Sequence, residues 1–190
     1  MPRPRQFDPD AVLDAAARVF HARGYEGTSV QDLADATGLS RSSLYGTWGD
    51  KHGLFLAALD RYAEAGRAGA SALCDGRPAL DAVRAVVGQA MEPGDAPGCL
   101  LVNAAGERAA TCPDTAQRAA AARGAMTARF EGLVRRAQAE GSVAADRDPA
   151  RLALLLTGVV FGLRALQTAG ATADEMAAVR DGALAALEGR

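Results

Sequence analysis

Apolar residues recur at helical spacing through the first third of the chain, in segments separated by residues typical of helix boundaries. Between Pro9 and Gly24 the apolar positions fall on one helical face. The next segments are much shorter and are bounded by Gly38 and Gly49. Residues that cap helices precede the four segments: Asp8, Ser29, Ser40 and Asp50. We predict helices over 9–23, 29–36 and 41–47, and a longer one that starts at residue 51.

Longer periodic segments follow, with breaks at 76–78, 92–97 and 111–114. The breaks predict helices over 78–91, 98–110 and 113–140. Asp148 with Pro149 starts a further helix, and Thr172 with Glu175 forms a capping box for the last one. No run of alternating β-branched residues indicates a strand. The pattern predicts an all-α fold of about nine helices, with a small head over 1–63 and a larger bundle over 64–190.

Composition agrees with a soluble helical protein. The chain has 190 residues, of which 45 are alanines and 5% are aromatic, and this favours helix over strand. The longest apolar run, Leu152–Leu163, is about half of the ~20 residues that cross a bilayer, so we expect no membrane contact. The first ten residues lack the apolar core of a signal peptide, and three cysteines without framework spacing do not indicate disulfides. We expect a reducing cytoplasm.

The region from Val30 to Trp48 meets the geometric needs of a helix-turn-helix. Ala34 is small where two helices would touch, and Gly38 lies where the turn needs a positive φ. Leu39 and Leu44 can supply the buried contacts that fix the crossing angle. The spacing by itself is moderately specific, so the flanking residues decide the interpretation.

With those flanking residues, segment 9–62 resembles the DNA-binding head of the TetR/AcrR family of bacterial transcriptional regulators. The residues that carry the resemblance are Phe20, Gly24, Tyr25, Thr28, Ser29, Val30, Asp32, Leu33, Ala34, Gly38, Leu39, Ser40, Leu44, Tyr45 and Lys51. The family usually has His and Phe where this chain has Thr47 and Trp48, so the aromatic plug is kept while the end of the second short helix departs from the pattern. The resemblance covers about a third of the chain.

A DNA-binding role has a physical basis in the exposed residues. Arg41 is the best candidate to read a guanine edge in the major groove. Helix starts and hydroxyl groups can hold phosphates, as can the single lysine of the chain, Lys51. Arg3 and Arg5 could follow the minor groove. The candidate DNA-binding residues are Thr28, Ser29, Ser40, Arg41, Ser42, Ser43, Tyr45 and Lys51.

Charge alone does not support this role. The net charge is −2, and residues 1–63 hold seven Lys and Arg against eight Asp and Glu. A solvated helical face could have the same composition, but a helix-turn-helix needs only a local face. Asp32 is expected to cap a helix, because a carboxylate facing phosphate would be repelled. The alternative function is an all-helical ligand-binding or partner-binding protein without specific DNA binding.

The later helices favour a homodimer. The segment from Pro149 to Ala169 is apolar nearly all round, which a monomer of this size could hardly cover. Gly158 and Gly162 would let another helix approach closely, although the same spacing also occurs in intrachain packing. The family resemblance implies that the last two helices pair with their symmetry mates in a four-helix bundle.

The resemblance also implies an effector pocket among the middle helices. The candidate lining residues are Met91, Cys99, Asn103, Met126, Phe130, Phe161 and Arg164. Asn103 would need a polar partner, either a ligand or a neighbouring helix. The segment Gly98–Asn103 is similar to the sixth-helix opening of a subgroup that includes electrophile- and oxidant-sensing repressors; Cys99 is either such a sensor or a small buried apolar residue.

No constellation for catalysis, metal binding or cofactor binding is expected. Both histidines, His21 and His52, lie in the head without a nearby nucleophile in the sequence. No Cys and His spacing suits zinc, and no Gly-rich loop joins a strand to a helix. The sequence therefore predicts a homodimeric repressor without enzymatic activity that leaves double-stranded operator DNA when a small molecule binds.

Overall fold

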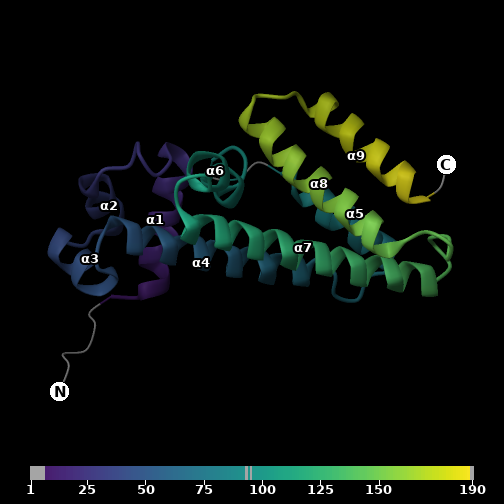
Figure 1. Ribbon diagram of the computed structural model, residues 1–190, viewed down its shortest axis with the longest axis horizontal. Coiled ribbons are helices and arrows are strands. Elements are labelled where there is room, and N and C mark those ends of the chain that lie inside the picture. The colour runs from purple at the N-terminus through teal and green to yellow at the C-terminus, as the bar shows by residue number, and fades with distance from the viewer. Residues whose placement is uncertain (1–6, 93, 95, 189–190) are drawn as a thin grey trace, which may run out of the picture.

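The computed structural model describes residues 7–92, 94 and 96–188. These residues form nine helices and contain no strand. The helices are α1 (Pro9–Arg23), α2 (Val30–Thr37), α3 (Arg41–Trp48), α4 (Lys51–Ala72), α5 (Ala79–Gln89), α6 (Leu100–Arg108), α7 (Pro113–Ala139), α8 (Pro149–Thr168) and α9 (Ala173–Glu188). Figure 1 shows an elongated molecule with α1–α3 at one end and α8 and α9 toward the other. The predicted all-α fold is confirmed.

Hydrogen bonds at the helix starts explain why the boundaries could be predicted. The Ser29 hydroxyl accepts from the Asp32 backbone N–H at 3.1 Å, and the Asp32 carboxylate accepts from the Ser29 backbone N–H at 2.8 Å. Asp50 likewise accepts from the Gly53 N–H at 2.8 Å. These side chains satisfy N–H groups that the first turn of a helix leaves without partners.

Helix α4 joins the two regions of the molecule. It runs without a break from Lys51 to Ala72, so the expected boundary between residues 63 and 64 falls inside it. Figure 1 shows α4 alongside α7 through the middle of the molecule. The head and the larger body therefore share one continuous helix.

The head is closed by an aromatic cluster. The ring of Phe55 meets those of Phe20 and Tyr25 edge to face, with centroids 5.0 and 4.9 Å away. Leu33 from α2 and Leu44 from α3 are fully buried against this cluster. The α6 residues Leu100, Leu101 and Ala104 belong to the same core.

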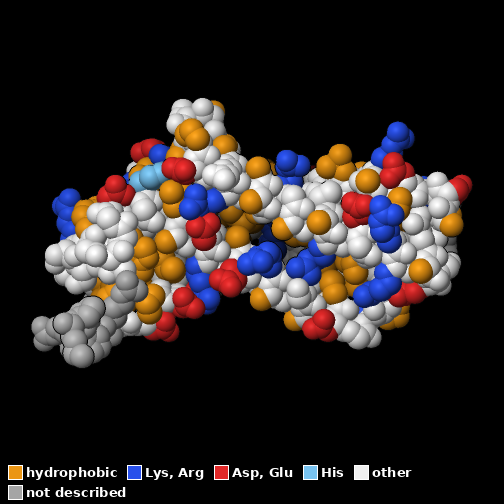
Figure 2. Space-filling model, turned by 60° about the horizontal axis from the view of Figure 1, so that its bottom comes forward, with side chains coloured by type: hydrophobic (Ala, Val, Ile, Leu, Met, Phe, Trp, Pro, Cys, Tyr) orange, Lys and Arg blue, Asp and Glu red, His pale blue; other side chains and the backbone are white. Residues whose placement is uncertain are grey.

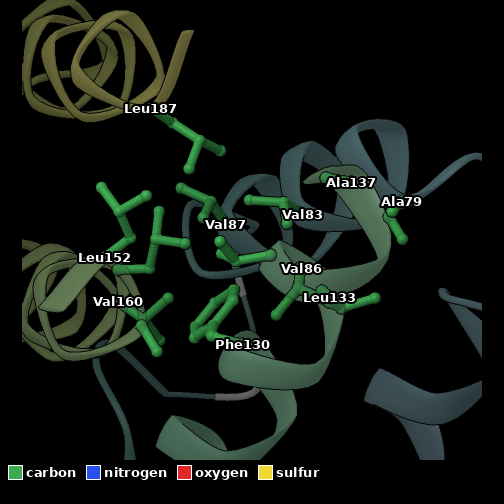
Figure 3. Packing of buried hydrophobic residues seen from close by; sticks show 14 of the residues in the cluster. Ala79, Val83, Val86, Val87, Phe130, Leu133, Ala137, Leu152, Val160 and Leu187 are labelled. Atoms are coloured by element: carbon green, nitrogen blue, oxygen red, sulfur yellow. The ribbon is translucent and has the colours of Figure 1, made fainter. Parts of the chain in front are cut away.

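The body has a larger aliphatic core made by α5, α7, α8 and α9. Figure 3 shows Val83, Val86 and Val87 of α5 directed toward Phe130 of α7 and Leu152 of α8. Phe130 is the aromatic residue of this core, and it is completely buried. Small and β-branched side chains make up most of the remainder.

Helix α8 is buried on one face and exposed on the other. Leu152, Leu156 and Leu163 lie in the body core, whereas Leu154 and Leu155 are 56% and 44% exposed. Among the described residues α8 is the one helix long and apolar enough to cross a membrane by length and composition, and one third of its apolar window is buried. Its packing against α7 and α9 is that of a core helix with one unpartnered apolar face.

Candidate nucleic-acid interface and internal cavity

A tight turn sets the angle between α2 and α3. Gly38 has a φ of 68°, in the left-handed region, and its N–H donates to the Ala34 carbonyl at 2.9 Å. Leu39 is half-buried and Leu44 is fully buried beneath α3. A side chain at position 38 would meet open space, so the backbone angle is what favours glycine. The predicted helix-turn-helix is present.

Helix α3 presents a row of polar side chains to solvent. The residues from Ser40 to Ser43 are all exposed. The Ser40 hydroxyl lies 2.9 Å from the hydroxyls of both Ser42 and Ser43, and it accepts from the Ser43 backbone N–H at 3.2 Å. The Arg41 guanidinium lies 5.3 Å from the centre of the Tyr45 ring. This face offers forked and hydroxyl donors without bulky aliphatic groups, as a major-groove helix requires.

Thr28, one of the residues predicted to contact DNA, is buried. The Thr28 side chain is 1% exposed, and its hydroxyl donates to the Gly24 carbonyl at 2.6 Å. This hydroxyl closes the turn between α1 and α2, so a contact between it and a phosphate would require the side chain to change its partner. Ser29 is exposed at the start of α2, with its hydroxyl and backbone N–H both donating to the Asp32 carboxylate.

Lys51 is held by an aromatic ring. Its ammonium lies 4.4 Å from the centre of the Tyr25 ring, and the guanidinium of Arg108 lies 3.7 Å from the same ring. The other predicted basic contacts, Arg3 and Arg5, lie outside the described residues.

Asp32 has the capping role that the sequence indicates. Its carboxylate accepts from the Ser29 hydroxyl at 2.7 Å and also bonds the Arg23 guanidinium. Hydrogen bonds from the side chain and backbone of Ser29, followed by Arg23, lower the pKa of Asp32. The group is ionised at neutral pH and turned back toward Ser29 at the start of its own helix.

Helix α6 clamps the head through contacts that sequence reasoning missed. The Glu107 carboxylate accepts from the backbone N–H groups of Tyr25 and Glu26, each at 2.9 Å. Arg108 donates to Glu26 at 2.7 Å. The partners are about 80 positions apart, and no local pattern marks them. One end of α6 therefore holds the turn that precedes α2.

A cavity of about 1070 Å³ lies between α4, α6, α7 and α8. Its lining includes Tyr62, Cys99, Met126, Phe161 and Arg164. Figure 2 shows a hollow at the waist of the molecule with basic side chains beside it, and acidic and basic groups interspersed over the rest of this face. The volume suits a small organic molecule.

Four of the seven predicted lining residues are brought together here, and three are not. Phe130 is fully buried in the body core, and Met91 packs against that core and accepts from Arg180 at 3.9 Å. Asn103 is half-buried on α6 outside the cavity wall. The neighbouring Val102 lines the cavity instead, because successive side chains on a helix diverge by about 100°.

Two polar groups of the cavity wall, Arg164 and Tyr62, already have partners. Arg164 donates to the backbone carbonyls of Gln89 and Glu92, at 2.9 and 3.4 Å. Burial raises the pKa of Tyr62, and the neighbouring Cys99 raises it further through charge and hydrogen bonding. The Tyr62 hydroxyl is therefore a neutral donor beside the Cys99 thiol at the cavity wall.

One histidine lies near a nucleophile, against expectation. The Nε2 atom of His52 is 3.9 Å from the Cys112 thiol and 3.6 Å from the Asp114 carboxylate, although His52 is 60 positions from Cys112. Both groups face the same ring nitrogen, and the buried Nδ1 atom has no hydrogen-bond partner among the described residues. A catalytic relay needs its carboxylate on the second nitrogen, so this arrangement does not form one.

Comparison with known proteins agrees with this geometry. Residues 12–58 match the family model described as bacterial regulatory proteins, tetR family, and residues 76–183 match the tetracyclin repressor-like C-terminal domain. The transcriptional repressor ComR of Escherichia coli (strain K12) is 29% identical over 180 residues, which cover 92% of this chain and 86% of ComR.

Solved structures show the same fold. A cysteine mutant of the TetR family regulator CifR, complexed with 26-base-pair operator DNA, is 34% identical with a TM-score of 0.83, covering 97% of this chain and 99% of that one. A regulator from Cytophaga hutchinsonii has a TM-score of 0.85 at 20% identity, over 98% of this chain and 100% of that one, and supports the fold alone. The chain belongs to the TetR family of DNA-binding transcriptional regulators.

Proposed function

We propose that the chain is a cytoplasmic homodimeric repressor, which binds an inverted-repeat operator through α3 and releases it when a small molecule fills the cavity. The observation that carries the proposal is the exposed polar face of α3, held by the buried Leu44 and the left-handed turn at Gly38. CifR, at 34% identity over nearly the whole chain, is a regulator whose complex with operator DNA is known.

The DNA contacts follow from the positions of the side chains. Arg41 reads a base edge, while Ser29, Ser40, Ser42 and Ser43 contact phosphates near the starts of α2 and α3. Tyr45 supports the guanidinium of Arg41, whose carbon lies 5.3 Å from its ring centre. Lys51 adds a phosphate contact after it leaves the Tyr25 ring.

A symmetric dimer would cover the apolar face of α8 and α9. Leu154, Leu155 and Val179 are the large apolar side chains that the structure exposes. A side chain at Gly158 would meet open space, so a partner helix can approach α8 closely at this point. Two heads on one symmetric body then read two half-sites.

Helix α6 is the proposed link between effector and DNA. Cys99 at its start lines the cavity, while Glu107 at its other end holds the backbone of Tyr25 and Glu26 in the head. A ligand that shifts α6 therefore shifts the head, and effector and DNA each lower the affinity of the other by the same factor. Modification of the Cys99 thiol is a second route to the same shift, and a Cys99→Ser variant separates the two routes.

The contacts of the candidate groups support binding over catalysis. His21 is within 3.1 Å of the Pro97 carbonyl, and His52 meets both the thiol and the carboxylate through one nitrogen. Arg164 is bound to backbone carbonyls. We therefore assign the cavity to effector binding and not to a reaction.

The deciding experiment selects DNA bound by the full-length protein from a random pool and then titrates salt on the winning duplex and on a scrambled one. We expect an inverted repeat, bound by two subunits and at least a thousandfold tighter than the scrambled duplex at equal salt, as about 10³–10⁷ is usual for specific regulators. Equal weak binding to both duplexes would refute the proposal and favour the alternative, a ligand-binding or partner-binding protein.

A further inference from the structure

Three side chains of metal-binding types converge where the head meets the body, away from the cavity. His52 lies in the first turn of α4, Cys112 directly precedes α7, and Asp114 lies in the first turn of α7. One ligand atom of each residue lies within 4.8 Å of the others. None of the three lines the cavity.

The spacing is close to that of a tetrahedral zinc site. With Zn–S near 2.3 Å and Zn–N or Zn–O near 2.05 Å, tetrahedral angles require about 3.6 Å between S and N, and about 3.3 Å between N and O. The observed distances are 3.9 Å from Cys112 Sγ to His52 Nε2 and 3.6 Å from His52 Nε2 to the Asp114 carboxylate. Each of these two pairs needs to approach by only about 0.3 Å, and the Cys112 sulfur and the Asp114 carboxylate lie within 4.8 Å of one another.

The ligand types point to one class of metal. A thiolate, an imidazole and a carboxylate together favour zinc over the hard cations, which prefer oxygen ligands alone. The thiolate and the carboxylate supply two negative charges, which match a divalent cation. The Nε2 atom of His52 faces the Cys112 sulfur and the Asp114 carboxylate, and its Nδ1 atom is buried.

The Cys112 thiol is buried and hydrogen-bonded. Cys112 is 7% exposed and accepts a hydrogen bond from the Thr115 hydroxyl at 3.3 Å. The same hydroxyl can donate to a thiolate, which is the form of cysteine that binds a metal. The nearby positive charge of Arg108 is paired with Glu26 at 2.7 Å.

We propose that His52, Cys112 and Asp114 bind one divalent cation of the zinc class, with solvent as the fourth ligand, and that this cation ties the start of α4 to the start of α7. Asp114 is 60% exposed at the side chain, which leaves a path for the ion and room for a water molecule. His52 directly follows the phosphate-contact candidate Lys51, and its ring lies 6.2 Å from the Tyr25 ring that holds this lysine. The cation would thus fix the head against the body independently of an effector.

The test uses Co²⁺ as a spectroscopic probe on full-length protein freed of metal by a chelator. We expect one equivalent of Co²⁺ to produce a thiolate-to-cobalt absorption band, which Zn²⁺ abolishes by displacement. Cys112→Ser should lose the band, whereas Cys74→Ser and Cys99→Ser should retain it. A band that persists in Cys112→Ser, or that disappears in Cys99→Ser, would overturn the proposal, as would the absence of binding.

A second variant excludes misfolding as the cause. Asp114→Asn changes an exposed side chain, so it should leave the thermal unfolding of metal-free protein unchanged while weakening Zn²⁺ binding at least about tenfold. Unchanged Zn²⁺ affinity in this variant and in His52→Gln would reject the assigned ligands. Operator binding measured with chelator present tests the repressor function separately, because the exposed face of α3 does not depend on the metal.

Discussion

The head and the body of this molecule are built from different side chains. Seven of the nine aromatic residues lie within the first 62 positions. In the head, Phe20, Tyr25 and Phe55 interlock at centroid distances of 4.9 to 6.1 Å. The body core is formed by valine, leucine and alanine around the single ring of Phe130.

This difference matches the two tasks that we propose, DNA binding by the head and effector binding by the body. Large rings with few rotatable bonds hold a small head in one conformation, which a helix must keep to fit a groove. The small aliphatic side chains of the body leave a cavity of about 1070 Å³ and an exposed apolar face. Rigidity in one region and adaptable packing in the other are what a regulator needs if a ligand in the body is to move the head as a unit.

The largest expected effect comes from the exposed face of the body. The double substitution Leu154→Glu and Leu155→Glu places charges at the proposed dimer interface. A symmetric dimer would bury four leucines there, and the burial of each would stabilise the dimer by about 1.5 kcal/mol or more. We expect a folded monomer and loss of operator binding, measured by light scattering and by DNA titration. Ala139→Glu, on an exposed position of α7, is the control and should stay dimeric. A dimer that persists in the double variant would place the interface elsewhere.

Truncating one ring in each core compares the two regions directly. Phe55→Ala and Phe130→Ala should each lower the free energy of unfolding by about 3–5 kcal/mol, because both side chains are fully buried. Since α4 and α6 connect the two cores, we expect a single cooperative transition in urea. The sole tryptophan, Trp48, reports on the head, whereas circular dichroism reports on all helices. Separate midpoints for the two signals in Phe55→Ala would show that the head unfolds alone.

The sequence predicted the features that depend on neighbouring residues and missed those that depend on how distant helices pack. Helix boundaries were accessible because their determinants are local: Ser29 and Asp32 are three positions apart, and both capping bonds are present. The exposed α3 residues followed from periodicity and from the family resemblance. Glu107, which holds Tyr25 from 82 positions away, and the Cys112–His52 pair depend on how helices pack, which local patterns do not encode. Asn103 was misplaced for the same reason, because one helical step decides whether a side chain faces a cavity.

An intermediate effect is expected at the recognition helix. Arg41→Ala should weaken operator binding by about 1–3 kcal/mol and relax the preference at one base pair. Arg135→Ala removes a charge that is 63% exposed on α7, away from the proposed dimer face, and should leave both properties unchanged. Competition between the operator and single-base variants of it measures the effect. Equal losses in the two variants would mean that net charge, and not the face of α3, governs binding.

The Lys51→Ala substitution should weaken binding to all DNA sequences alike. Lys51→Ala removes one phosphate contact, so the slope of log affinity against log salt should fall by about 1 on operator and scrambled DNA together. The variant also removes the ammonium from the Tyr25 ring, worth about 0.5–1 kcal/mol at an exposed site, so unfolding is measured in parallel. An unchanged salt slope would show that this lysine stays on the ring in the complex.

The smallest effect concerns two equivalent helix caps, one in each region. The pKa of Asp32 in the head is lowered by Ser29 and then by Arg23, and the pKa of Glu175 in the body is lowered by the backbone and side chain of Thr172. A carboxyl whose pKa is lower in the folded chain stabilises the fold above its unfolded pKa, near 3.8 for Asp and 4.5 for Glu, and this contribution is lost as the pH falls through the folded value. Asp32→Asn and Glu175→Gln should therefore lower the unfolding midpoint at pH 7, and their differences from wild type should shrink below about pH 4.

The head variant alone should also weaken operator binding, since Asp32 fixes the start of α2 beside Ser29. Urea midpoints at several pH values check the first expectation, and a difference from wild type that stays constant into acid would rule out the carboxylate as its source.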